Sequence, residues 1–222
     1  FEHYRDYSKR QAVISPSSID VWIEQSYAHN SIGSVALRRG DVELAAKEFA
    51  ASLALKTRAY NASPKNKQLQ ADLADSLSWL AQTNMQTGKL DHATDLYRQE
   101  LALLQDLRDR YPSEALWLNR LSSAWSHQAE VKRARGELAA SGTDLQNAQT
   151  LLEQIVNRDA SNRSWQRNLH FAQLKLIEAN LTDQNAAASL DRIEVLGQRF
   201  DDLIVLDPKR VALKTMRSEL GY

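Results

Sequence analysis

The segment TGKLDHATDLY at residues 87–97 repeats the pattern of RGDVELAAKEF at residues 39–49. Each segment has a Gly, an Ala five residues later and an aromatic residue four residues after that, as Gly40, Ala45 and Phe49 show in the earlier one. The offset between the two glycines is 88 − 40 = 48. A pattern that recurs at one fixed offset indicates an internal structural repeat.

The same offset recurs along the whole chain. Gly136 continues the glycine series. A second series, with the same spacing of 48 residues, contains all four prolines, and Ala160 takes the place of a proline at one position; the prolines are Pro16, Pro64, Pro112 and Pro208. We therefore divide the chain into repeats at 16–63, 64–111, 112–159 and 160–207, the last one degenerate, with a partial leading helix at 1–15 and a trailing helix at 208–222. Because this register starts the chain at Phe1 in the middle of a second helix, we expect a fragment of a larger protein.

Within each repeat the apolar residues follow a helical period, as Leu69, Leu73 and Leu77 illustrate. Pro beside Ser, Asn or Asp is typical of a helix start, and Gly before a charged residue is typical of a turn between helices. Each repeat is therefore predicted to be two antiparallel helices of about 20 residues, roughly 30 Å long at 1.5 Å per residue. The predicted fold class is all-α.

These residues make the chain resemble the tetratricopeptide (TPR) repeat family. The residues that carry the resemblance are Ile32, Gly33, Gly40, Ala45 and Phe49, then Leu80, Ala81, Gly88, Ala93 and Tyr97, then Trp125, Ala129, Gly136, Ser141 and Leu145, and last Ile177, Gln184, Ser189 and Ile193. The usual TPR unit has about 34 residues, so the repeat here is about four helical turns longer. Long-repeat members of the kinesin light chain type are the nearest analogue. The resemblance implies a right-handed superhelical solenoid of about four repeats plus partial terminal helices.

Composition excludes several classes of function. Lys plus Arg and Asp plus Glu each total 28, so the chain has no net charge with which to recruit nucleic acid, and direct binding to it is not expected. The chain has no Cys, which excludes disulfides and thiolate chemistry. No apolar run approaches the ~18 residues of a membrane span, so this segment is not expected to insert into a membrane. The expected compartment is the cytoplasm, with the periplasm as the alternative.

The sequence shows little catalytic chemistry. Its five histidines lack the spacing of metal ligands, and surface or capping positions are predicted for them; they are His3, His29, His92, His127 and His170. No phosphate-binding loop or nucleophile elbow is present, so we expect no metal, no cofactor and no catalytic residue. His127, Glu130 and Arg133 share one helical face and are the one weak indication of an enzyme, but ordinary surface charge explains them.

In TPR-like stacks the first helix of each repeat lines a concave groove, where such proteins bind peptides or partner helices. Projecting the resemblance onto this chain places a mixed set of side chains there: Tyr27, Asn30, Ser34, Arg38, Asp75, Ser78, Trp79, Gln82, Ser126, His127, Glu130, Arg133, Phe171, Lys175 and Glu178. Trp79 is predicted to be exposed, because the residues at equivalent positions of the other repeats are polar. The carboxylate clamp of the family has no equivalent, since Asn30 and Ser34 occupy its positions, and chaperone tails are not expected to bind.

The function we predict is a non-catalytic protein–protein interaction scaffold that binds a peptide or helix of a partner protein in this groove. The alternative is a regulatory or sensor segment of a larger, bacterial signalling or transcription-control protein. If the chain forms a homo-oligomer, its terminal helices are the expected contact, because a trimmed solenoid exposes apolar surface.

Overall fold

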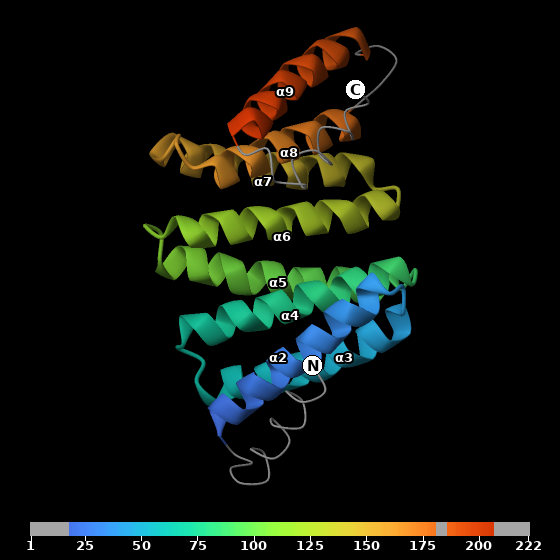
Figure 1. Ribbon diagram of the computed structural model, residues 1–222, viewed down its shortest axis with the longest axis vertical. Helices are drawn as coiled ribbons and strands as arrows, with labels where there is room; N and C mark the ends of the chain where they lie inside the picture. The colour runs from blue at the N-terminus through green and yellow to red at the C-terminus, as the bar shows by residue number, and fades with distance from the viewer. Residues whose placement is uncertain (1–17, 181–185, 207–222) are drawn as a thin grey trace. The chain divides into compact units, whose positions relative to one another are not determined.

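The computed structural model describes residues 18–180 and 186–206, and within these residues every regular element is an α-helix (Figure 1). The helices are α2 (Ile19–Arg38), α3 (Val42–Ala62), α4 (Lys67–Gln86), α5 (Leu90–Arg110), α6 (Ala115–Ala134), α7 (Leu138–Arg158), α8 (Arg163–Ala179) and α9 (Ala186–Leu206). The predicted all-α class is confirmed. The predicted leading helix at 1–15, the trailing helix at 208–222 and Gln184 lie outside the described residues.

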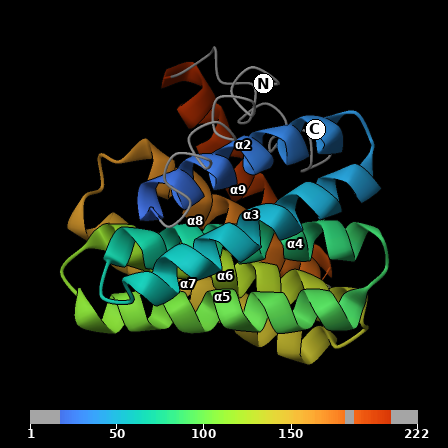
Figure 2. The same ribbon diagram turned by 90° about the horizontal axis from the view of Figure 1, so that it is seen from below.

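The chain forms two compact units, Phe1–Tyr111 and Pro112–Tyr222. In the first unit, α2 packs on α3, α3 on α4 and α4 on α5, and both views show the helices of each pair side by side (Figures 1 and 2). In the second unit, α6 packs on α7, α7 on α8 and α8 on α9. Most helices have 20 or 21 residues and α8 has 17, which confirms the predicted length of about 20. The repeat boundaries stay a prediction.

The glycine series forms the turns within the helix pairs, as predicted. Gly40, Gly88 and Gly136 have φ angles of 78°, 73° and 79°, a left-handed conformation that favours glycine. At the end of α2, the Gly40 amide donates to the Leu37 carbonyl at 3.0 Å and the Asp41 amide donates to the Ala36 carbonyl at 2.9 Å. This pair of bonds is a Schellman motif, which satisfies the last carbonyls of the helix and ends it.

Side-chain caps begin several of the helices. The Asn66 side chain accepts from the Gln68 amide at 2.9 Å at the start of α4, and Asn162 accepts from the Trp165 amide at 3.2 Å at the start of α8. Asp41 caps α3 by accepting from the Leu44 amide at 3.0 Å. Each cap satisfies a helix N–H group that has no partner within the helix.

The contact between the two helices of a repeat depends on a small residue opposite a large one. In the first repeat, a Cβ atom added to Gly33 would lie 2.8 Å from Cε1 of Phe49, whose side chain is completely buried. In the third repeat, Ala129 packs in one cluster with Leu145. The fourth repeat has Ile177 at the position of Gly33, and Ile193 packs against its cluster at the position of Phe49. The first and third repeats thus place a small residue opposite a large one, whereas the fourth places two side chains of equal size there.

Candidate binding surfaces

In the first unit, the predicted binding residues lie on α2 and α4, the first helices of two successive repeats. We call Tyr27, Asn30, Ser34 and Arg38 of α2, together with Asp75, Ser78, Trp79 and Gln82 of α4, the first-helix surface. Tyr27 is 39% exposed and Trp79 is 40% exposed, and both are among the large hydrophobic side chains most open to solvent. Arg38 and Gln82 are also exposed, and the other four side chains are half-buried.

A hydrogen bond links α2 to α4 at this surface. The Tyr27 hydroxyl donates to Oδ2 of Asp72 at 3.1 Å, and Nε2 of Gln68 donates to Oδ1 of the same carboxylate at 2.9 Å. Asp72 was not among the predicted residues. A signal for it was present, because Glu24 and Arg120 occupy the equivalent positions of the neighbouring repeats, so this position stays polar in a helix that is otherwise largely buried.

The surroundings of Tyr27 are acidic. Burial, then the charge of Asp72 and the hydrogen bond to it, and then the charges of Glu24 and Asp75, raise the pKa of Tyr27 to about 12. The phenol therefore remains a neutral hydrogen-bond donor near neutral pH. From α3, the buried Lys56 ammonium lies 5.2 Å from the centre of the Tyr27 ring and supports it from beneath by a cation–π contact.

Trp79 is held by a stacking contact. Its ring lies 5.6 Å from the ring of Phe49, centre to centre, with an angle of 18° between the two planes. Phe49 is completely buried, so the core of the first repeat fixes the orientation of an indole that is still 40% exposed. A large aromatic side chain with a fixed orientation is a typical anchor for a binding partner, because little side-chain entropy remains to be lost.

In the second unit the predicted residues mainly contact their own helix. The Ser126 hydroxyl donates to the Ser122 carbonyl at 3.1 Å within α6. On α8, the Lys175 ammonium lies 3.1 Å from Oε2 of Glu178 and 5.2 Å from the centre of the Phe171 ring. The remaining predicted residues lie along α6, where His127 is half-buried and Glu130 and Arg133 are exposed. On α8 the predicted charges and the aromatic ring are thus already paired locally.

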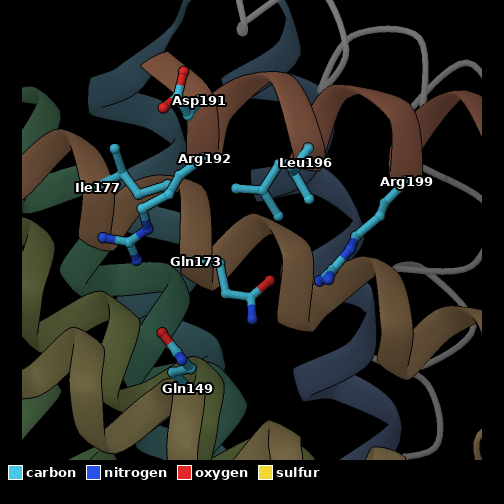
Figure 3. Close-up of a pocket in the computed structure, with 8 residues that line it drawn as sticks. Gln149, Gln173, Ile177, Asp191, Arg192, Leu196 and Arg199 are labelled. Carbon is cyan, nitrogen blue, oxygen red and sulfur yellow. The ribbon is translucent and has the colours of Figure 1, made fainter. Parts of the chain in front are cut away.

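The second unit also contains a pocket of about 280 Å³ that the sequence did not predict (Figure 3). Its lining comes from α7, α8 and α9 and consists of Gln149, Gln173, Ile177, Asp191, Arg192, Val195, Leu196 and Arg199. The signal that could have found it is a change of polarity between repeats. Leu53 and Leu101 occupy the positions equivalent to Gln149, and Leu77 and Trp125 occupy those equivalent to Gln173 in the second and third repeats, although His29 stands there in the first.

One histidine departs from the predicted surface position. His170 on α8 is half-buried, and its ring meets the buried ring of Phe200 edge to face at a centre distance of 5.8 Å. Burial, with a smaller contribution from the charge of Arg199, lowers the pKa of His170 to about 4. The surface prediction was wrong for His170, because its equivalents Ser26, Ala74 and Ser122 are all buried small side chains, and the position faces the interior.

Among the described residues, no group of three or more His, Asp or Glu side chains is placed to hold a metal ion. None of the described helices is both long enough and apolar enough to cross a membrane.

No family model matches the sequence, and no curated protein matches it. Among solved structures, BtubC (BKLC) from P. vanneervenii is similar, with a TM-score of 0.52 and 13% sequence identity over 99% of this chain and 89% of that one. The chain has a TPR-like helical-repeat fold. A TPR repeats protein (BF2334) from Bacteroides fragilis is also matched, over 88% of this chain and 97% of that one, with 12% identity and a TM-score of 0.32, too low to bear on the fold.

Proposed function

We propose that the protein is a non-catalytic interaction scaffold, and that the first-helix surface binds a peptide or helix from a protein partner that presents a Lys or Arg side chain. The observation that carries this proposal is the pair of partly exposed aromatic side chains, Tyr27 and Trp79, which are held in place by contacts from the core. Pre-positioned aromatic anchors contribute much of the binding energy in protein interfaces.

The charges around Tyr27 favour a basic side chain in the partner. Glu24, Asp72 and Asp75 all act electrostatically on the Tyr27 phenol and outnumber the Lys56 ammonium beside its ring. An excess of carboxylates beside an aromatic ring attracts a Lys or Arg side chain. At the other end of α2, Arg38 is exposed in the last helical turn. These charges of opposite sign would orient the partner along α2, with its basic residue at the Tyr27 end.

A peptide selection tests this proposal. Random peptides displayed on phage are selected on the whole chain, and we expect enrichment of sequences that combine Lys or Arg with an aromatic or aliphatic residue. Binding of a synthetic enriched peptide, measured by isothermal titration calorimetry, should weaken at least tenfold in Trp79→Ala and in Asp75→Asn. It should also weaken as salt rises, because exposed charges are screened.

The matched controls lie away from this surface. Leu138→Ala removes an exposed apolar side chain of α7, and Asp95→Asn removes an exposed carboxylate of α5. Both should leave peptide affinity within about twofold. Circular dichroism confirms that each variant is folded. The proposal fails if no peptide is enriched, or if Trp79→Ala and Asp75→Asn bind the peptide as tightly as the controls do.

The alternative, a regulatory or sensor segment, has no contact among the described residues that favours it over the scaffold.

A further inference from the structure

The pocket in the second unit has an unusual origin. Two of its lining positions are Leu in each preceding full repeat and polar here, and a third is apolar in two of the three preceding repeats. Gln149 stands at the position of Leu53 and Leu101, Arg199 at that of Leu55, Leu103 and Leu151, and Gln173 at that of His29, Leu77 and Trp125. Side chains that are buried or half-buried in the other repeats are thus replaced by two amides and a guanidinium around a space of about 280 Å³.

The two amides need hydrogen-bond donors. Nε2 of Gln149 donates to Oε1 of Glu153 at 2.8 Å, which identifies the other end of the amide as the oxygen. Oε1 of Gln149 and Oε1 of Gln173 are both buried without a hydrogen-bond partner. An unpaired buried acceptor is unfavourable, and the terminal torsion of a Gln side chain rotates easily. A ligand with N–H groups in the pocket would supply the missing donors.

Two exposed guanidinium groups, those of Arg192 and Arg199, contribute positive charge to the lining of the pocket. Arg192 and Arg199 reach the pocket from α9, and Figure 3 shows both side chains directed toward the side where Gln173 lies. Within the described part of the chain neither of them forms an ion pair, and the pocket lining contains one carboxylate, Asp191. Guanidinium groups bind carboxylates through two parallel hydrogen bonds, which gives both affinity and orientation.

The rest of the lining is apolar, with Ile177 and Leu196 buried in the core cluster and Val195 beside them. The volume of about 280 Å³ lies just below the range of roughly 300–1,000 Å³ that is usual for pockets that bind drug-sized molecules. The pocket therefore fits a small molecule that has an anionic end, N–H donors and a short apolar group.

We propose that this pocket binds a free amino acid with an apolar side chain. The carboxylate pairs with Arg199, the ammonium group donates to the oxygens of Gln149 and Gln173, and the side chain packs on Ile177, Val195 and Leu196. The site lies wholly in the second unit and shares no residue with the first-helix surface. Its test is therefore independent of the proposed function.

The test uses the whole chain and five probes: L-leucine, L-isoleucine, L-valine, L-methionine and L-phenylalanine. We expect at least one of them to raise the melting temperature at millimolar concentration and to give a saturable calorimetric titration. Affinity for that amino acid should fall at least tenfold in Arg199→Gln and in Gln173→Leu. Leu occurs at the equivalent position 77, so Gln173→Leu is expected to fold. Arg98→Gln, at an exposed position of α5, is the matched control and should bind normally.

Blocked analogues separate the free amino acid from the end of a peptide chain. The amide of the amino acid lacks the carboxylate, and the N-acetyl form replaces the ammonium with an amide like that of a peptide C-terminus. Both should bind at least tenfold more weakly than the free form. The proposal is wrong if none of the five probes binds, if the N-acetyl form binds equally well, or if Arg199→Gln and Gln173→Leu bind like the Arg98→Gln control.

Discussion

The first and fourth repeats place opposite kinds of residue at the contact between their two helices. In the first, the smallest residue, Gly33, faces the large ring of Phe49, and a single added carbon at Gly33 would come within 2.8 Å of that ring. In the fourth, Ile177 and Ile193 share the contact. A Gly lets the second helix approach closely enough for the Phe ring to fill the space between the helices. Two branched aliphatic side chains of equal size do not interlock in this way.

Equivalent helix pairs in this chain thus differ in what lies beside them, a fixed aromatic ring in the first repeat and a pocket in the fourth. The tightly packed first repeat holds the ring against which Trp79 stacks. The fourth repeat, with the amide of Gln173 and the guanidinium of Arg199, borders a pocket. The tight Gly33–Phe49 contact therefore accompanies an exposed aromatic surface. The Ile177–Ile193 contact, with polar residues around it, accompanies a pocket.

The largest expected effect comes from removing the ring of the first repeat. Phe49→Ala should lower the free energy of unfolding by about 3–5 kcal/mol, because it leaves a cavity at a fully buried position. The corresponding change in the fourth repeat, Ile193→Ala, should cost about 2 kcal/mol or less, because Ile193 is only half-buried. Urea unfolding gives the two values, and hydrogen exchange shows in which helices protection is lost. Equal costs would contradict the difference in packing.

Replacing two helical glycines by Ala should change stability by a smaller amount and in opposite directions, which tests the tight packing of the first repeat. Gly33→Ala forces its Cβ to 2.8 Å from Cε1 of Phe49 and should destabilise the fold by about 1–2 kcal/mol, since overpacking exceeds the gain in helix propensity. Gly142→Ala in α7 is the matched control. Its Cβ would lie 3.5 Å from Oδ1 of Asn180, an ordinary contact, so it should stabilise the helix by about 0.5–1 kcal/mol. Thermal melts of both variants decide the matter, and a stabilised Gly33→Ala would refute the tight contact.

The smallest effect depends on pH and belongs to the second unit. The folded state keeps His170 neutral, with its pKa lowered to about 4 from the usual 6.5, so protonation favours unfolding as pH falls from 6.5 toward 4. His170→Gln should reduce the drop in melting temperature over this range, whereas His92→Gln, at an exposed position, should leave it unchanged. Partial burial and solvent screening keep the effect small. Identical pH profiles for the original chain and His170→Gln would count against a buried, neutral His170.

The repeating part of the fold was predictable from sequence. Periodic glycines and apolar residues specify where helices turn and which faces pack, and the left-handed Gly40, Gly88 and Gly136 lie at the predicted turns. These features are local, since one residue's backbone preference or one helical face is enough to produce each of them.

The candidate sites were predictable only in part. Polar equivalents of Trp79 correctly indicated its exposure, but they did not reveal that Phe49 stacks on one side of its ring. His170, Gln149 and Arg199 were missed because each differs in kind from the residues at the equivalent positions of the other repeats, whereas Asp72 was missed although its position stays polar. Whether an exceptional polar residue faces water, a neighbouring helix or an internal space depends on contacts between helices, which a linear pattern does not specify.

The left-handed glycine turns also bear on how such a chain changes length. Each turn closes its own helix with its own hydrogen bonds, as Gly40 and Asp41 do for α2, and the next such turn follows one full repeat later, at Gly88. An insertion or deletion of one whole repeat would join equivalent helix positions, whereas an insertion within a helix that is not close to a whole number of turns would rotate its apolar face into water. Gene duplication can therefore lengthen this molecule by whole repeats. Each added repeat can then acquire its own binding residues.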